Sequence, residues 1–495
     1  MDFVVRNWRT LFPPEPPKSD NALKFGLIGA ANIAPSALIR PAKSHPEVTI
    51  QGVAARDRKK AAAFATKHRI PQVYDSYEAL LNDPNIDAVY IALPNGLHFE
   101  WAMRALAQGK HVLLEKPSVN NGDEATRLFT SPLVRQPRVD GSPPPLLLEA
   151  FHFRFQPTWQ YFLSLLDRPN INFANAVAKV PGFFFKKDDI RFRYNLGGGS
   201  MMDLGTYNFA ALRDVFQAEP EACLSCVVRK CAAPHELCDA AATTRFRFPG
   251  GHLGMAECDL QANTLIPHIP TVEVQHHPIA VAVNAVPGLK PPPKVPDGYE
   301  LVRERRITLY NFILCGFWHR IDIEDEYKVR RIDNHQIVYG RWQKKTSKKA
   351  YTFKDAGIDQ PGEPFWLSYR HQLEQFVNRV RTRPGSGLWV SHDDSRNQAR
   401  MIDMAYKETD LPLRPASQFQ LQQQAAQPQQ GAPQQAEPQQ AEPQQEELQQ
   451  AEPQQDAPQQ NETAHHEQEQ VVPGHGEPQQ TVPDPGPAEP NTPAN

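Results

Sequence analysis

The sequence predicts an N-terminal α/β domain with a parallel sheet, then an α+β domain with a large, open and mostly antiparallel sheet. Residues 23–150 alternate short apolar runs with helical patterns, as βαβ units do. Residues 151–415 contain longer strand-like runs, which are typical of an open antiparallel sheet. Residues 416–495 are rich in Gln and Pro, with Phe419 as the only aromatic residue. Such a segment cannot offset its ordering entropy by burying apolar surface, so a disordered tail is predicted.

The first domain is expected to begin after a proline-bearing leader, residues 1–22. Its predicted strands are four short apolar runs at 25–28, 48–54, 88–92 and 111–114. Helical patterns separate these runs, so the strands are expected to be parallel and joined by crossover helices. A proline-rich stretch at 134–145 is interpreted as a surface insertion, because proline cannot sit in a central strand.

The second domain is predicted from strand-like runs that are followed by two helices. The runs are 176–185, 224–230, 242–248, 254–260 and 306–314, and the helices are at about 365–381 and 393–408. Another proline-rich stretch, 278–296, is also interpreted as a surface insertion.

Composition excludes several classes of protein. The formal net charge is −3, so there is no global basic field to hold nucleic acid or an anionic membrane. No apolar run reaches the roughly 18 residues of a membrane-spanning helix. The six cysteines are too sparse for a disulfide scaffold, and those between 223 and 238 lack the paired short spacings of a zinc site. We expect no metal and a cytoplasmic location.

The first predicted strand runs into residues 29–34, Gly-Ala-Ala-Asn-Ile-Ala. This is the place of the Gly-x-Gly-x-x-Gly turn of dinucleotide-binding folds, here with alanine at the second and third glycine sites. Gly29 allows the tight turn, and the start of the next helix supplies unpaired N–H groups for phosphate. An ordinary strand–helix turn is the alternative. The position in the first βαβ unit favours a dinucleotide site.

The end of the second predicted strand bears on the choice of dinucleotide. NAD sites place an acid there for the ribose hydroxyls, whereas Ala55 and then Arg56 stand here. A missing acid followed by arginine suits the 2′-phosphate of NADP. Asp57 keeps NAD open, because a one-residue shift of the strand end would make it a ribose ligand. A solvated helix start is a further interpretation of this basic run.

Two more motifs follow the third and fourth predicted strands. Residues 93–98 read Leu-Pro-Asn-Gly-Leu-His, and 115–117 read Glu-Lys-Pro. Both lie at carboxyl ends of parallel strands, where such sheets bind ligands. A lysine there can act as a general acid–base or hold a substrate hydroxyl. A surface ion pair is the alternative for a lone Glu-Lys pair.

A glycine-rich segment of the second domain adds further polar residues. Residues 196–207 read Leu-Gly-Gly-Gly-Ser-Met-Met-Asp-Leu-Gly-Thr-Tyr. The glycines let the chain pass close to a ligand, and Ser200 is expected to cap a helix. Asp203 and Tyr207 are one helical turn apart, so they are expected to share a face, where a carboxylate can orient a phenol as a proton donor. The alternative is an exposed Asp203 with Tyr207 packed in the core.

Together, residues 29–34, 94–98 and 115–117 resemble the glucose–fructose oxidoreductase/inositol dehydrogenase (Gfo/Idh/MocA) family. The resemblance covers about 23–415 and includes the glycine loop, the run 148–151 and the arginine after it. Tyr207 stands where many members carry histidine. A tyrosine at this position resembles the glucose–fructose oxidoreductase, xylose dehydrogenase and dihydrodiol dehydrogenase branch of the family. The resemblance also implies a homodimer through the sheet of the second domain, where the 261–305 insertion falls.

The resemblance implies an NADP-dependent oxidoreductase acting on a sugar-like or dihydrodiol substrate, of the D-xylose 1-dehydrogenase or trans-dihydrodiol dehydrogenase type. The expected catalytic residues are Lys116, Tyr207 and Asp203. Cofactor contacts are expected from Gly29, Ala31, Asn32, Ile33, Arg56, Leu93, Pro94, Asn95, His98, Glu115 and Lys116. Substrate contacts are expected from Arg154, Arg191, Asp203 and Tyr207. The alternative is a non-catalytic dinucleotide-binding regulatory protein of the same fold, with which the glutamine-rich tail is compatible.

Overall fold

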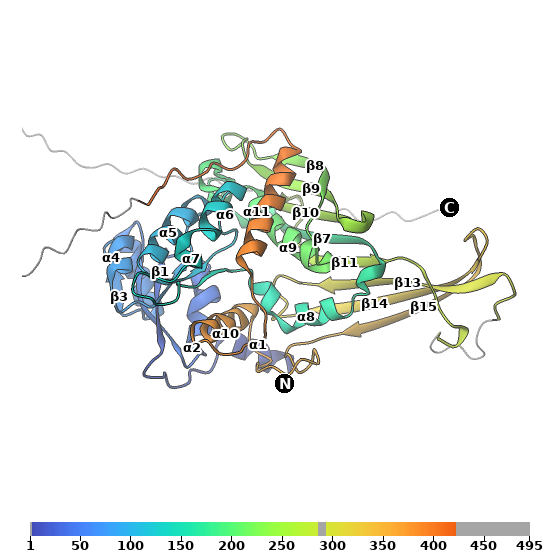
Figure 1. Cartoon of the computed structure of the whole chain (residues 1–495), viewed down its shortest axis with the longest axis horizontal. Coiled ribbons are helices and arrows are strands. Elements are labelled where there is room, and N and C mark those ends of the chain that lie inside the picture. The colour runs from blue at the N-terminus through green and yellow to red at the C-terminus, as the bar shows by residue number, and fades with distance from the viewer. Residues whose placement is uncertain (1, 286–293, 422–495) are drawn as a thin grey trace, which may run out of the picture. The chain divides into compact units, whose positions relative to one another are not determined.

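Two sheets organise the chain in the computed structural model, which describes residues 2–285 and 294–421 (Figure 1). The first is a parallel sheet of six strands, and the second is a mixed sheet of nine. The predicted combination of an α/β and an α+β domain is therefore confirmed. Most of the predicted tail, from residue 422 onward, and residues 286–293 of the second proline-rich insertion lie outside the described residues.

The first sheet has the strand order β3-β2-β1-β4-β5-β6, and every pairing in it is parallel. The strands are β1 (Leu23–Ile28), β2 (Val48–Ala54), β3 (Gln72–Tyr74), β4 (Ala88–Ile91), β5 (His111–Leu114) and β6 (Leu147–Glu149). The helices between them are α2 (Arg40–Lys43), α3 (Arg58–His68), α4 (Tyr77–Asn82), α5 (His98–Ala107), α6 (Gly122–Phe129) and α7 (Pro132–Arg135). The strand order reverses between β1 and β4, which is where sheets of this kind bind ligands.

The second sheet has the order β15-β14-β13-β11-β7-β10-β9-β8, with β12 paired to β13. Its strands are β7 (Ile171–Pro181), β8 (Ala222–Lys230), β9 (Asp239–Arg247), β10 (Leu253–Ala262), β11 (Thr271–His276), β12 (Ile279–Ala280), β13 (Tyr299–Tyr310), β14 (Arg320–Arg331) and β15 (Ile337–Lys348). Among the described strands of this second sheet, only β7 and β10 pair in parallel. The open, mostly antiparallel sheet is thus as expected.

Four α-helices follow the parallel sheet in the described residues: α8 (Pro157–Ser164), α9 (Thr206–Phe216), α10 (Ser368–Val380) and α11 (His392–Lys407). Helix α9 packs on β7 and β10, while α11 contacts both α9 and helix α6 of the first sheet. The long strands β13, β14 and β15 run out past α8 in Figure 1. Helix α11 therefore links the two sheets.

Strands β14 and β15 were not predicted, because charged side chains interrupt their apolar pattern. Cross-strand ion pairs occupy these positions, with Arg306 2.8 Å from Glu324 and Lys328 2.7 Å from Glu304. Cross-strand pairs of opposite charge stabilise a sheet without apolar burial. A homodimer through this sheet stays a prediction.

The leader contains a helix, α1 (Phe3–Leu11), that packs with its polar side inward. Arg6 is buried and donates to the carbonyls of Gly316 and Phe317 at 3.0 and 2.8 Å. Its guanidinium also lies 3.5 Å from the ring centre of Tyr351, a cation–π contact. The large side chain of Trp8 is 63% exposed instead. The leader is therefore part of the packed structure.

The packed chain extends beyond residue 415. Arg127 donates to the carbonyls of Ser417 and Phe419 at 3.0 and 2.7 Å. The guanidinium of Arg104 lies 4.6 Å from the ring centre of Phe419. The one aromatic residue of the predicted tail thus docks on helices α5 and α6.

Within residues 2–285 and 294–421, no helix combines the length and apolar character needed to cross a bilayer. The six cysteines are all free, and five of them are buried. The same described residues contain no group of three or more His, Cys, Asp or Glu side chains placed to hold a metal ion.

Candidate active site

The turn after β1 has the geometry that its glycine suggested. Gly29 has φ +104°, and a Cβ at this position would lie 2.9 Å from the carbonyl oxygen of Ala92. The following helix begins with a π-helical turn at Pro35–Ile39. The amides of Asn32 and Ile33 donate to no acceptor within the described part of the chain, and both residues are exposed. Unpaired amides before a helix fit a pyrophosphate group.

Arg56 is exposed at the end of β2, whereas the Asp57 side chain is bound to the start of α3. Asp57 is the N-cap of α3, and its carboxylate accepts from the amides of Lys59 and Lys60 at 2.9 and 3.2 Å. Arg56 is exposed, and its amide donates to the Tyr77 hydroxyl at 3.2 Å. The acid that could have served the ribose of NAD is therefore engaged as a helix cap.

The loop after β4 brings the two parts of the chain together. Asn95 Nδ2 donates to the carbonyl of Gly197 in the glycine loop at 2.9 Å. A Cβ on Gly96 would lie 2.9 Å from the carbonyl oxygen of Asn195, so the two loops are in close contact. Leu93 and Pro94 are half-buried at the same edge of the sheet.

The side chain of His98 faces the protein interior, and its role as a cofactor ligand stays a prediction. Its side chain is fully buried, with Nδ1 2.8 Å from the carbonyl oxygen of Pro117 and Nε2 2.8 Å from that of Leu93. Burial lowers the pKa of His98 to about 4. Both ring nitrogens face carbonyls, so the ring ties the loops after β4 and β5 together. This role requires partners that sequence spacing alone does not reveal.

Glu115 is also turned to the protein. It is 8% exposed, and the hydroxyl of Tyr90 donates to its carboxylate at 2.5 Å. Burial raises the pKa of Glu115, because the charged form loses hydration. Its neighbour Lys116 points instead toward the second part of the chain.

Lys116, Asp203, Tyr207 and Arg191 come together as a cluster. Lys116 Nζ donates to Asp203 Oδ1 and to the Asp203 carbonyl, each at 2.9 Å. The same nitrogen lies 4.6 Å from the ring centre of Tyr207. Arg191 Nε donates to Asp203 Oδ2 at 2.8 Å. Three residues predicted from two separate motifs, together with Arg191, therefore meet at the carboxyl edge of the parallel sheet. We call them the lysine cluster.

The helix that carries Asp203 is capped by a residue other than the expected one. Residues Met201–Gly205 form a π-helical turn before α9, and Ser200 makes no side-chain cap. Ser200 Oγ donates instead to Asp239 Oδ2 at 2.6 Å, and the Met201 amide donates to the same oxygen at 2.7 Å. The prediction for Ser200 is wrong, because the buried carboxylate of Asp239 supplies the acceptor from another strand.

Charge in the lysine cluster follows from these contacts. Burial would raise the pKa of Asp203, but Lys116 and Arg191 more than offset it, so the pKa lies well below its usual range. Burial, followed by the neighbouring Tyr369 and Glu115, raises the pKa of Tyr207 well above its usual value. At neutral pH, Asp203 is therefore a carboxylate and Tyr207 a phenol.

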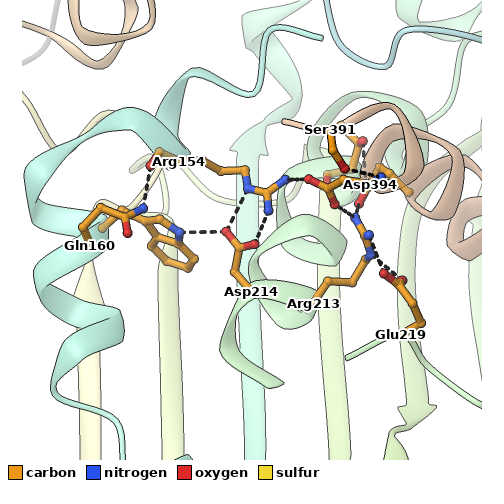
Figure 2. A network of polar contacts seen from close by, with 10 residues as sticks. Arg154, Gln160, Arg213, Asp214, Glu219, Ser391 and Asp394 are labelled. Carbon is orange, nitrogen blue, oxygen red and sulfur yellow. Dashed lines mark hydrogen bonds and ion pairs between the residues drawn. The ribbon is translucent and has the colours of Figure 1, made fainter. Parts of the chain in front are cut away.

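Arg154 does not join the lysine cluster, and its role as a substrate ligand stays a prediction. Figure 2 shows its guanidinium between Asp214 and Asp394, with which it forms ion pairs. Arg213 continues the network, 2.6 Å from Asp394 and 2.7 Å from Glu219. A cavity of about 460 Å³ borders these side chains. The two acids that hold Arg154 are distant in sequence, which is why its partners could not be foreseen.

Sequence reasoning missed His152. Its Nε2 lies 3.0 Å from the Tyr207 hydroxyl, and its Nδ1 lies 2.8 Å from Ser368 Oγ. The only available signal was its place just after the last strand of the parallel sheet, at the edge where the other site residues lie.

Comparisons with known proteins show the class of protein to which the chain belongs. Residues 23–132 match the model described as "Oxidoreductase family, NAD-binding Rossmann fold", and residues 171–268 match the "GFO/IDH/MocA C-terminal domain". The chain is 31% identical to trans-1,2-dihydrobenzene-1,2-diol dehydrogenase of Mus musculus over 244 residues, 49% of this chain and 70% of that protein. The chain therefore belongs to the Gfo/Idh/MocA oxidoreductase family, and the resemblance found in the sequence is confirmed.

Other relatives are similar over a shorter length. D-xylose 1-dehydrogenase (NADP(+)) 2 of Haloferax volcanii is 37% identical over 203 residues, 40% of this chain and 58% of that enzyme. The chain thus matches less than two thirds of the length of this relative. A crystal structure of a 3-ketoreductase from Actinomadura kijaniata with NADP and TDP-benzene superposes with a TM-score of 0.56 at 21% identity, covering 78% of this chain and 98% of that one. That likeness shows a shared fold.

Proposed function

We propose that this protein is an NADP-dependent oxidoreductase that moves a hydride between nicotinamide and a carbinol carbon of a sugar-like or dihydrodiol substrate. The lysine cluster is the observation that carries the proposal. It places an ammonium, a phenol and an ionised carboxylate together at the carboxyl edge of a dinucleotide-binding sheet. Relatives named for xylose and dihydrobenzenediol oxidation support this substrate class.

The residues at the sheet edge fit a dinucleotide. The turn at Gly29 and the amides of Asn32 and Ile33 would hold the pyrophosphate, with Ala31 beside it. Arg56 would face the 2′-phosphate, since Asp57 is engaged as a helix cap. Bound NADP supplies the hydride chemistry, and the protein supplies orientation and proton transfer.

Two groups of the lysine cluster would act on the substrate hydroxyl. Lys116 would bind the hydroxyl oxygen, since Asp203 and its carbonyl fix the ammonium in place. Tyr207 would donate or accept the proton. Its raised pKa keeps it protonated at neutral pH, as a general acid for carbonyl reduction must be. Arg191 would keep the Asp203 carboxylate in place through its hydrogen bond to Oδ2.

The decisive experiment measures turnover of pentoses, hexoses, dihydrodiols and a nucleotide-linked keto sugar, each with NADP(H) and NAD(H). We expect at least one substrate to be turned over, and Lys116→Ala to abolish that turnover. Lys179→Ala is the matched control, because Lys179 also pairs with an acid, Glu257, at 2.7 Å but lies outside the lysine cluster. Tight dinucleotide binding with no turnover across the panel would favour the regulatory protein instead.

A further inference from the structure

A buried chain of three polar groups ends at Tyr207. His152 is 0% exposed and Ser368 is 2% exposed. The imidazole bridges them, with Nδ1 2.8 Å from Ser368 Oγ and Nε2 3.0 Å from the Tyr207 hydroxyl. The ring is held in place by Tyr369, whose centre lies 3.9 Å away. The geometry allows either ring nitrogen to carry the proton, so the direction of both hydrogen bonds depends on the tautomer.

The tautomer of His152 decides which of the two hydroxyl groups, Ser368 or Tyr207, has an acceptor in the protein. Burial lowers the pKa of His152 to about 3, with a further contribution from Lys116, so the imidazole is neutral and has one N–H. Within the described residues Ser368 Oγ has His152 as its only polar partner. With the proton on Nδ1, the Ser368 proton would have no acceptor, and with the proton on Nε2, the Tyr207 proton would have none within the described residues. Ser368 is enclosed by the protein, whereas Tyr207 lies beside Lys116 in the lysine cluster, where a substrate oxygen would accept its proton. This difference favours the proton on Nε2, with Ser368 donating to Nδ1.

We propose that His152 is a positioning residue for Tyr207 and that its Nε2–H donates to the phenolic oxygen, leaving the Tyr207 proton free to reach the substrate. This rests on the proposed function. Within the described residues the Tyr207 hydroxyl has no other polar partner, so its own proton is not engaged by the protein. With the opposite tautomer, Tyr207 would donate to His152 and its proton would be occupied.

The arrangement also stabilises the product of proton transfer. In the reductive direction, the carbonyl carbon gains a hydride from the reduced nicotinamide dinucleotide, and the carbonyl oxygen takes the Tyr207 proton. The phenolic O–H bond breaks and the substrate O–H bond forms. The phenolate left behind would accept the Nε2–H of His152 and lie near the ammonium of Lys116, 4.6 Å from the ring centre. Oxidation reverses each step.

The tautomer can be measured without turnover. We would label the histidines of the full chain with ¹⁵N and record the ring nitrogens by NMR, assigning His152 by the signals lost in His152→Gln. We expect the proton on Nε2 in the wild type, and a shift toward Nδ1 in Ser368→Ala, which removes the donor to Nδ1. A proton on Nδ1 in the wild type would overturn the proposal, whether or not a substrate has been found.

Kinetics of three variants test the consequence. A glutamine amide can take the place of Nε2 and donate to Tyr207, whereas leucine cannot. We expect His152→Leu to lower kcat by about tenfold or more, as for the loss of one hydrogen bond to a developing charge, with KM changed by less than about threefold. His152→Gln should retain kcat within about threefold on the same scale. The control is His371→Gln, because His371 is equally buried on α10 but outside this chain.

The outcomes separate the inference from the function on which it rests. If His152→Leu and His152→Gln lose kcat equally, or if neither loses any, His152 does not act as the donor and the proposal fails. If His371→Gln loses as much as His152→Leu, the loss reflects a disturbed core, and the proposal again fails. If the wild type turns over no substrate, the proposed function fails, while the tautomer measurement still decides the direction of the hydrogen bond.

Discussion

Asp239 offers the sharpest test of how the site is held. Its Oδ2 accepts from Ser200 and from the Met201 amide. Its Oδ1 accepts from Arg414 at 2.9 Å and from Tyr406 at 2.7 Å. Both members of the Asp239–Arg414 ion pair are fully buried. The Asp239→Asn substitution preserves the shape of the side chain but leaves the Arg414 charge without its counter-ion and turns an NH₂ group toward donors.

We expect Asp239→Asn to lower the free energy of unfolding by about 3–5 kcal/mol, the range for breaking a buried pair on one side. Urea unfolding followed by fluorescence would measure it. The control is Asp410→Asn, because Asp410 pairs with Lys230 on the surface, with side-chain exposures of 69% and 43%. A loss below about 1 kcal/mol is expected for the control. Equal effects of the two substitutions would refute the view that Asp239 anchors the glycine loop.

Three further predictions concern the site and its edges. Tyr207→Phe should lower kcat by roughly 10²-fold with little change in unfolding, checked by steady-state kinetics and denaturation. Arg56→Ala should weaken the binding of NADPH by about 1.5–3 kcal/mol more than the binding of NADH. Arg58→Ala is the control and should not do so, because Arg58 lies outside the proposed phosphate contact. Equal losses of binding for both cofactors in Arg56→Ala would contradict the assignment. A chain ending at residue 415 should melt at lower temperature than one ending at 421, because it lacks the contacts of Arg127 with Ser417 and Phe419; coincident melting curves would contradict this.

The sequence revealed the parts of the fold that are encoded locally. Strands β2 and β5 lie at the predicted residues because each is a short, mostly apolar run between helical patterns. Strand β14 was missed because charged side chains interrupt its apolar pattern, and their ion-pair partners on β13 and β15 are not visible in any single run of sequence. Helix α1 was not foreseen as packed structure, since its buried residues are Arg6 and Thr10 and its apolar residues face outward.

The site residues also differ in how far the local sequence predicts them. Lys116 and Asp203 were found because each belongs to a compact motif whose residue types state its chemistry. The partners of Arg154 and His98 could not be predicted because they are fixed only by the tertiary structure: two distant acids for Arg154, and two backbone carbonyls for His98. His152 was missed because a lone histidine carries no motif, and only the distance to Tyr207 shows its role.

The lysine cluster exists only when the two sheets are correctly placed against each other. Lys116 follows β5 of the first sheet, whereas Asp203 precedes α9 on the second. The segment around Arg414 contacts both the loop after β5 and the glycine loop. Asn121 donates to the Arg414 carbonyl at 2.9 Å, and Arg414 itself donates to the Gly198 carbonyl in the glycine loop at 2.5 Å. Each such bond contributes roughly 1 kcal/mol, so several must act together to fix the distance between ammonium and carboxylate. Arg414 therefore matters to the site through geometry, although it touches none of the cluster's side chains.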